Sequence, residues 1–270
     1  MGTKKLLLLA IGIAALGFGY YFWQAKPESP APQLVAEAPP PPALPAEPPA
    51  PVEPVERYPL AVSTEPPEKT APLDIDQSDA LYSKAIGKLF GKKILSSYFY
   101  PERMIRRFVA TIDNLPREAA PVAMMPVKPV GGAFLVQREA GAMSIAPAND
   151  QRYARHLKIM AGVDAKRLVD MYVDLYPLFQ QAYRELGYPK GFFNDRLIET
   201  IDNLLATPDV PPPLALEQPK VLYKFADPAL EGRSAGQKIM LRLGADNRAK
   251  AKQVLTTIRA ELLSRSPARP

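Results

Sequence analysis

The sequence predicts a mainly α-helical protein with an N-terminal membrane anchor, and three observations lead to this prediction. An uncharged apolar run covers residues 6–23, and a proline-rich tract follows it over residues 27–72. Beyond that tract the apolar residues recur mainly with helical spacing. We therefore divide the chain into an anchor with a short cytoplasmic start (1–26), a linker (27–72), a globular domain (73–265) and a tail (266–270).

Residues 6–23 have the length and composition of a transmembrane helix. Eighteen apolar residues are about the minimum that crosses a hydrocarbon core of roughly 30 Å, and Lys4 and Lys5 favour a cytoplasmic N-terminus. A cleaved signal peptide is the alternative, but the run ends in bulky aromatics where cleavage requires small residues. We expect a single-pass inner-membrane protein whose C-terminal domain lies in the periplasm.

The linker is predicted to be disordered. Residues 27–72 contain 16 of the chain's 32 prolines and seven glutamates, with Arg57 and Lys69 as the bases. This composition offers too little apolar surface to offset the entropy of ordering. The prolines favour an extended conformation of about 3.1 Å per residue, so we interpret the tract as a spacer of long reach.

Charge and composition narrow the function classes. Residues 73–270 carry 29 bases against 21 acids, an excess that favours anionic neighbours. The bases are dispersed and no nucleic-acid motif is present, so we expect no nucleic-acid binding. Cysteine is absent and His156 is the single histidine, which disfavours thiolate, triad and zinc chemistry. We predict no cofactor and no metal, and we favour a binding protein over an enzyme.

Helical periodicity defines most of the globular domain. The clearest stripe runs from Asp164, a predicted N-cap, to Gly187, a predicted stop, and it passes Pro177 without a change of phase. We therefore expect one long helix kinked near Pro177, with two separate helices as the alternative. Further helices are predicted at about 79–96, 149–161 and 234–243, and from the stripes at Met104–Leu115, Leu197–Leu205 (after Asn194 as N-cap) and Ala251–Leu262.

One segment does not follow helical spacing. Ala133–Glu139 and Ala142–Ile145 flank Ala140 and Gly141. Two short apolar runs separated by a glycine-containing pair are typical of a β-hairpin. We therefore predict a short hairpin within the helical domain.

The sequence also contains an internal echo. The motif TIDNL occurs identically at Thr111–Leu115 and Thr200–Leu204, each time at the end of a helical stripe. The echo suggests an internal duplication with repeats of about 79–118 and 164–208.

Each copy of the echo contributes one aspartate, Asp113 or Asp202. If the copies face each other, the two carboxylates could meet, and glycoside hydrolysis uses such a pair as acid and base or nucleophile. The interpretation that we favour is that each Asp-Asn pair bonds local backbone groups near a helix end. A cell-wall glycan hydrolase using Asp113 and Asp202 is therefore the alternative function.

The candidate binding surface is the connection GYPKGFFNDR, Gly187–Arg196. It combines a helix stop, a tight turn and a polar helix start, and loop-borne side chains often contact ligands. The alternative is a well-specified connection between two helices, with its aromatic residues in the core. The candidate residues are Tyr176, Tyr188, Phe192, Phe193, Asn194, Asp195 and Arg196.

Four segments of the globular domain are distinctive. They are Phe108–Pro116 (FVATIDNLP), Tyr176–Arg196 (YPLFQQAYRELGYPKGFFNDR), Tyr223–Glu231 (YKFADPALE) and Gly236–Gly244 (GQKIMLRLG). Together they resemble a bacterial family known as domain of unknown function 3014, over most of residues 75–262. The resemblance implies a membrane-anchored envelope protein of Gram-negative bacteria, and it implies no reaction, cofactor or catalytic residue.

These observations lead to one functional expectation. We expect an inner-membrane-anchored periplasmic protein that acts as a binding or scaffolding module of the cell envelope. The expected partners are the membrane, through residues 6–23, and an envelope protein or the cell-wall glycan. The sequence leaves the oligomeric state open.

Overall fold

A computed structural model of the chain describes residues 55–60 and 75–266. This part of the chain contains ten α-helices, two short 3-10 helices and four strands. The first helices are η1 (Ile75–Gln77), α2 (Ser78–Phe90), α3 (Lys92–Tyr98), α4 (Met104–Asn114), η2 (Val122–Met124) and α5 (Asn149–Ala161). The later helices are α6 (Ala165–Asp174), α7 (Tyr176–Glu185), α8 (Phe193–Leu205), α9 (Pro228–Glu231), α10 (Ala235–Arg242) and α11 (Ala245–Ser264). The strands are β1 (Val136–Glu139), β2 (Ala142–Ile145), β3 (Ala215–Glu217) and β4 (Lys224–Phe225).

The predicted anchor lies outside the described residues. The same holds for most of the predicted linker and of the tail, at residues 27–54, 61–72 and 267–270. Within the described ranges, no helix has both the length and the apolar composition that crossing a bilayer requires. The membrane span at 6–23 therefore stays a prediction.

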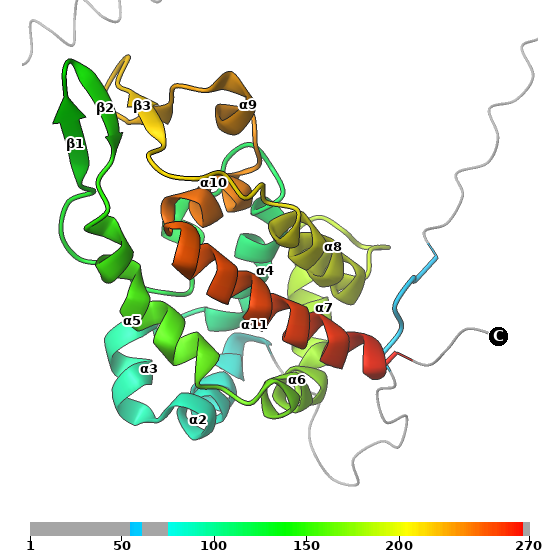
Figure 1. Ribbon diagram of the computed structural model, residues 1–270. Coiled ribbons are helices and arrows are strands. Elements are labelled where there is room, and N and C mark those ends of the chain that lie inside the picture. Colours follow the sequence, from blue (N-terminus) through cyan, green and yellow to red (C-terminus); the bar gives the residue numbers. More distant parts are fainter. Residues whose placement is uncertain (1–54, 61–74, 267–270) are drawn as a thin grey trace, which may run out of the picture. The chain divides into compact units, whose positions relative to one another are not determined.

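The large hydrophobic core forms where α4, α7 and α8 pack together. α4 contacts both other helices, while α11 lies along α5, α6 and α8 (Figure 1). Ile105, Leu178 and Ile198 have no exposed surface, and full burial of such a side chain contributes about 1.5–3 kcal/mol. Phe193 stacks on Phe179 with 5.8 Å between the ring centroids. The start of α8 is therefore fixed by its own core contacts.

The two TIDNL copies occupy the ends of α4 and α8, which pack against each other. Equivalent side chains have different partners. The Thr111 hydroxyl donates to the carbonyl of Met124, whereas the Thr200 hydroxyl donates to that of Ile112. The helical setting of both copies is confirmed, and the duplication stays a prediction.

The expectation of one long helix beginning at Asp164 is wrong. α6 and α7 are separate helices, with Leu175 between them at φ −100° and ψ 2°. Pro177 has no N–H to donate to the carbonyl of Val173, and its ring clashes with that turn, so the first helix ends before it. The predicted N-cap is confirmed, because the Asp164 carboxylate accepts a hydrogen bond from the amide of Arg167 at 2.8 Å.

The helix predicted over residues 79–96 is also divided. α2 ends at Phe90 and α3 begins at Lys92. Gly91 between them has φ +87°, a conformation that L side chains rarely adopt and that interrupts the helical hydrogen bonds.

The predicted hairpin is confirmed as β1 and β2. Ala140 and Gly141 have φ values of 48° and 83°, and a type I′ turn requires positive φ at both positions. β3 and β4 extend the hairpin into a four-stranded antiparallel sheet in the order β1-β2-β3-β4. Leu216, Phe225 and Leu241 form a second, smaller core between the sheet and α10.

Leu262 links the end of α11 to the large core, where it is 1% exposed. We expect Leu262→Ala to lower the free energy of unfolding by about 2–5 kcal/mol, because it removes buried contacts and leaves a cavity. Urea denaturation followed by circular dichroism measures this change. Thr257→Ala, on the exposed face of the same helix, is the control and should stay within about 0.5 kcal/mol. Equal effects of the two substitutions would contradict this packing.

Candidate functional site

The first turn of α8 presents three consecutive polar side chains, Asn194, Asp195 and Arg196. The prediction that Asn194 caps this helix is wrong. α8 begins at Phe193, and the residue before it, Phe192, makes no side-chain cap. The side chain of Gln180, from α7, accepts a hydrogen bond from the Phe193 amide at 2.8 Å. All three polar side chains instead bond groups outside the helix.

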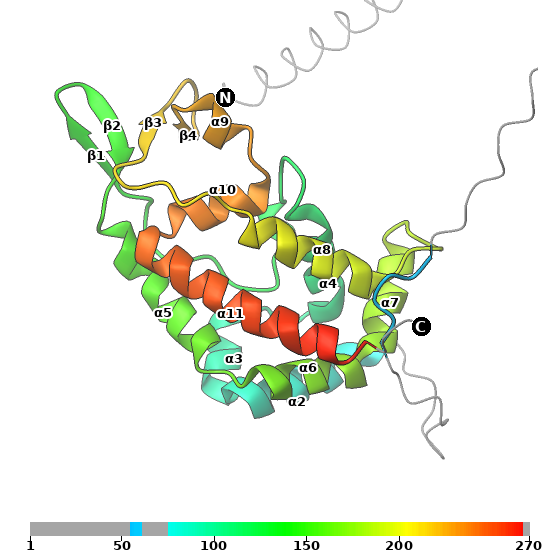
Figure 2. The same ribbon diagram turned by 45° about the vertical axis from the view of Figure 1, so that its right-hand side comes forward.

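Asn194 and Asp195 hold a short segment of the same chain, residues 55–60, which bends at Arg57 and Tyr58. The Asp195 carboxylate accepts hydrogen bonds from the amides of Arg57 and Tyr58, each at 2.8 Å. The Asn194 amide donates to the carbonyl of Tyr58 at 2.7 Å. Figure 2 shows this segment beside α7 and the connection to α8. We call the surface around Asn194 and Asp195, on which residues 55–60 lie, the α8 docking site.

Two side chains of the docked segment add apolar contacts. Leu60 is buried in the large core, and Tyr58 packs against that core while half-buried. The Tyr172 hydroxyl donates to the amide oxygen of Asn194 at 3.2 Å, which orients the amide nitrogen towards Tyr58. Burial raises the pKa of Tyr172, so its hydroxyl stays a donor.

Arg196 connects the α8 docking site to Asp113 at the end of α4. Its Nε donates to the Asp113 carboxylate at 3.1 Å, and a second guanidinium nitrogen donates to the backbone carbonyl of Asp113 at 2.6 Å. Arg117 forms a salt bridge with the same carboxylate at 2.7 Å. The Tyr188 hydroxyl donates to it at 3.2 Å. The side chain of Asp113 is only 5% exposed, so these partners replace its hydration.

The aromatic candidates divide between the core and the site. Tyr176 and Phe193 are buried, while Tyr188 and Phe192 are half-buried. Tyr188 stacks on Tyr183 with 4.5 Å between ring centroids. Tyr188 and Phe192 line a pocket of about 400 Å³ beside the docked segment, together with Val55, Arg57, Asp113, Arg117, Tyr183, Asp195, Arg196 and Glu199. The structure thus brings Tyr188, Phe192, Asp195 and Arg196 to one place.

Burial also sets the protonation state of Tyr183 at this pocket. It raises the pKa of Tyr183 to about 12, and the negative charge of Asp113 acts in the same direction. The hydroxyl therefore remains neutral at physiological pH.

Asp113 and Asp202, the two aspartates of the hydrolase alternative, pair with different arginines. Asp202 bonds Arg259 of α11 through both carboxylate oxygens, and its side chain is 45% exposed. Asp113 is buried and pairs with Arg196, which is largely buried, and with Arg117, which is half exposed. Both carboxylates thus have structural partners, and nothing in this arrangement favours the hydrolase.

The docked segment was missed by sequence reasoning. Arg57 and Tyr58 fall within the tract predicted to be a linker, and 138 residues separate Arg57 from Asp195. A local signal was present, because Tyr58 is the single aromatic residue between residues 27 and 72.

Comparison with known proteins agrees with the resemblance seen in the sequence. Residues 104–259 match the family described as protein of unknown function (DUF3014). The chain belongs to this family. Neither the curated proteins nor the solved structures contain a match to the chain. The matched region of this DUF3014 protein includes α4, α7 and α8, and hence Asp113, Asn194, Asp195 and Arg196.

Asp113 and Asp202, the aspartates of the two TIDNL copies, allow a matched test of how burial changes the contribution of a carboxylate to stability. We expect Asp113→Asn to lower the free energy of unfolding by about 1–3 kcal/mol, because the largely buried Arg196 loses its charged partner, while the half-exposed Arg117 can be hydrated. Asp202→Asn should cost only about 0–1 kcal/mol, since water screens its pair with Arg259. Denaturation of both variants in parallel measures the difference. Similar losses would contradict the assignment of Asp113 as the buried partner.

Proposed function

We propose that this DUF3014 protein is an inner-membrane protein whose helical domain acts as a binding module of the cell envelope in the periplasm. The apolar run at residues 6–23, with Lys4 and Lys5 before it, supports the anchor and its orientation. The proline-rich spacer gives the domain reach. The α8 docking site is the proposed binding site, and its ligand is a polypeptide segment held by its main chain.

One observation carries this proposal: the site contacts the main chain of a bound segment, at the two residues where that segment bends. Two amides and one carbonyl of residues 57 and 58 pair with Asp195 and Asn194. Hydrogen bonds to a peptide's main chain give affinity that does not depend on its sequence, while contacts with its side chains give selectivity. Here the selective contacts are those of Tyr58 and Leu60 with the core.

The same observation favours a protein partner over the cell-wall glycan. Asp195 offers two carboxylate oxygens to two consecutive main-chain amides 2.8 Å away, so the arrangement observed at this site is one of side chains with a polypeptide. In the proposed function, residues 55–60 occupy the site in the resting chain. A partner segment of similar shape replaces them.

A peptide in trans tests the site directly. We make the release variant Tyr58→Gly/Leu60→Gly in the full chain, which removes the apolar contacts of the internal segment. A fluorescent peptide with the sequence of residues 55–60 should bind this variant more tightly than it binds the wild type, where the internal segment competes. Fluorescence anisotropy measures both affinities.

Two further substitutions in the release variant localise the binding. Asp195→Asn should abolish it, because the carboxylate accepts both amide hydrogen bonds. Glu217→Gln, an exposed acid on β3 that does not line the pocket beside the α8 docking site, makes the same change of charge and should leave binding intact. If a folded release variant fails to bind the peptide, the proposed site is wrong.

The proposed location has its own test. Reporter fusions after Pro270, one active only outside the cytoplasm and one only inside, report where the domain lies. We expect activity from the outside reporter alone. Activity of the inside reporter would place the domain in the cytoplasm and overturn the envelope role.

A further inference from the structure

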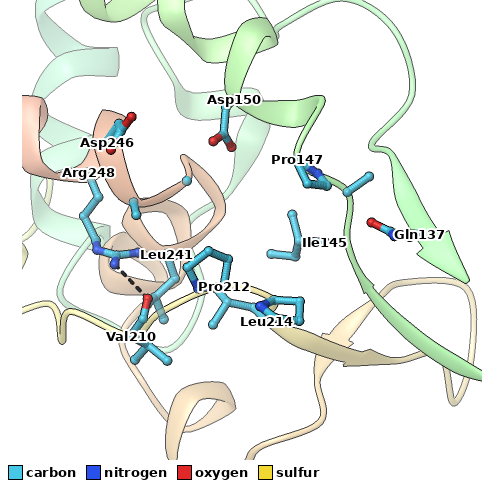
Figure 3. A pocket seen from close by; sticks show the side chains of 14 residues that line it. Gln137, Ile145, Pro147, Asp150, Val210, Pro212, Leu214, Leu241, Asp246 and Arg248 are labelled. Atoms are coloured by element: carbon cyan, nitrogen blue, oxygen red, sulfur yellow. Dashed lines mark hydrogen bonds between the residues drawn. The ribbon is translucent and has the colours of Figure 1, made fainter. Parts of the chain in front are cut away.

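A cleft of about 530 Å³ lies between the small sheet and the start of α11 (Figure 3). It shares no lining residue with the pocket beside the α8 docking site. Most of its wall is apolar and comes from the end of β2, the segment before β3 and the end of α10. The main apolar residues are Ile145, Pro147, Val210, Pro212, Leu214 and Leu241. A cavity of this size with an apolar wall and few polar groups has the composition of a ligand site.

Two carboxylates lie at one side of this cleft. Asp150 belongs to the first turn of α5, and Asp246 belongs to the first turn of α11. In Figure 3, Asp150 and Asp246 lie above the apolar side chains of Ile145, Leu241 and Pro212. Among residues 55–60 and 75–266, neither carboxylate makes a salt bridge or accepts a hydrogen bond.

The arginine of the cleft does not neutralise these acids. Arg248 is buried, and its Nε donates to the Asp209 carboxylate at 3.3 Å. Another of its nitrogens donates to the carbonyl of Val210 at 3.0 Å, the dashed line in Figure 3. Lys252 pairs with Asp209 as well. Arg248 is therefore committed to the segment that precedes β3.

The backbone at the start of α11 fixes the position of Asp150. Gly244 has φ +87°, and a Cβ at this residue would lie 2.1 Å from an Asp150 carboxylate oxygen. The glycine therefore allows the carboxylate to lie directly against the chain. Burial, and then the negative charge of Asp246, raise the pKa of Asp150. A cation beside the carboxylate would act in the opposite direction, because it favours the charged form.

We propose that this cleft binds a lysine side chain of a partner polypeptide. The aliphatic stem lies against the proline and leucine wall, and the ammonium group lies between Asp150 and Asp246. Lysine matches this arrangement because it joins a flexible four-carbon stem to a compact charge. The chain's own linker carries seven glutamates against two bases, so its charge has the wrong sign for this site.

The test titrates the full chain with three end-blocked, fluorescent pentapeptides that differ only in the central residue: lysine, norleucine or glutamate. Norleucine retains an aliphatic stem and lacks the charge. We expect measurable binding of the lysine peptide, at least about tenfold weaker binding of the norleucine peptide, and none of the glutamate peptide. Equal binding of the lysine and norleucine peptides would overturn the proposal.

Variants of the full chain place the binding in the cleft. Asp150→Asn and Asp246→Asn should each weaken binding of the lysine peptide about tenfold or more. Glu217→Gln, an exposed acid on β3 outside the cleft, makes the same charge change and should have no effect. Thermal unfolding confirms that each variant is folded. Unchanged binding in both aspartate variants contradicts the assignment.

A competition arm separates a polypeptide from a small ligand. Free butylamine has a stem and an ammonium group but no peptide backbone. We expect it to displace the lysine peptide only at concentrations far above the peptide's dissociation constant. Displacement at equal concentration would identify a small amine as the ligand and overturn the assignment to a polypeptide.

Discussion

The first turn of α8 connects the start of the described chain to the core of the domain. Asp195 and Asn194 hold residues 57 and 58 by their main chain, while Arg196 pairs with the buried carboxylate of Asp113 on α4. Removing one partner of such charged, poorly hydrated contacts costs more free energy than removing a neutral one. The docked segment and the packing of α4 against α8 therefore share one short stretch of sequence. The proposed binding role depends on that stretch.

The sequence was sufficient to predict most helices, because each needs an apolar face towards the core and therefore shows a period near 3.6 residues. It was not sufficient for the interruptions. A stripe can keep its phase across Pro177 although the proline ends the hydrogen-bond ladder at Leu175. The strands β3 and β4 have three and two residues, too few for an alternation pattern. They exist because the β1–β2 hairpin offers an edge to pair with.

The position of the candidate site in the sequence was predictable, but the residues that its side chains contact were not. Helix stop, tight turn and polar helix start mark Gly187–Arg196 in the sequence. The contacts of Asp195 with Arg57 and of Arg196 with Asp113 span 138 and 83 residues, and no local spacing encodes such pairs. The cleft at Asp150 is also assembled from separate segments. Only the fold places its two acids together beside an apolar wall.

Hydrogen exchange at the amides of Arg57 and Tyr58 tests the central claim most directly, because each donates to Asp195. In the wild-type full chain both amides should exchange slowly compared with the same residues in a free peptide. In Asp195→Asn the protection should be lost while the amides of the α8 core remain protected. Fast exchange at both positions in the wild type would contradict the account, since residues 55–60 would then not occupy the α8 docking site.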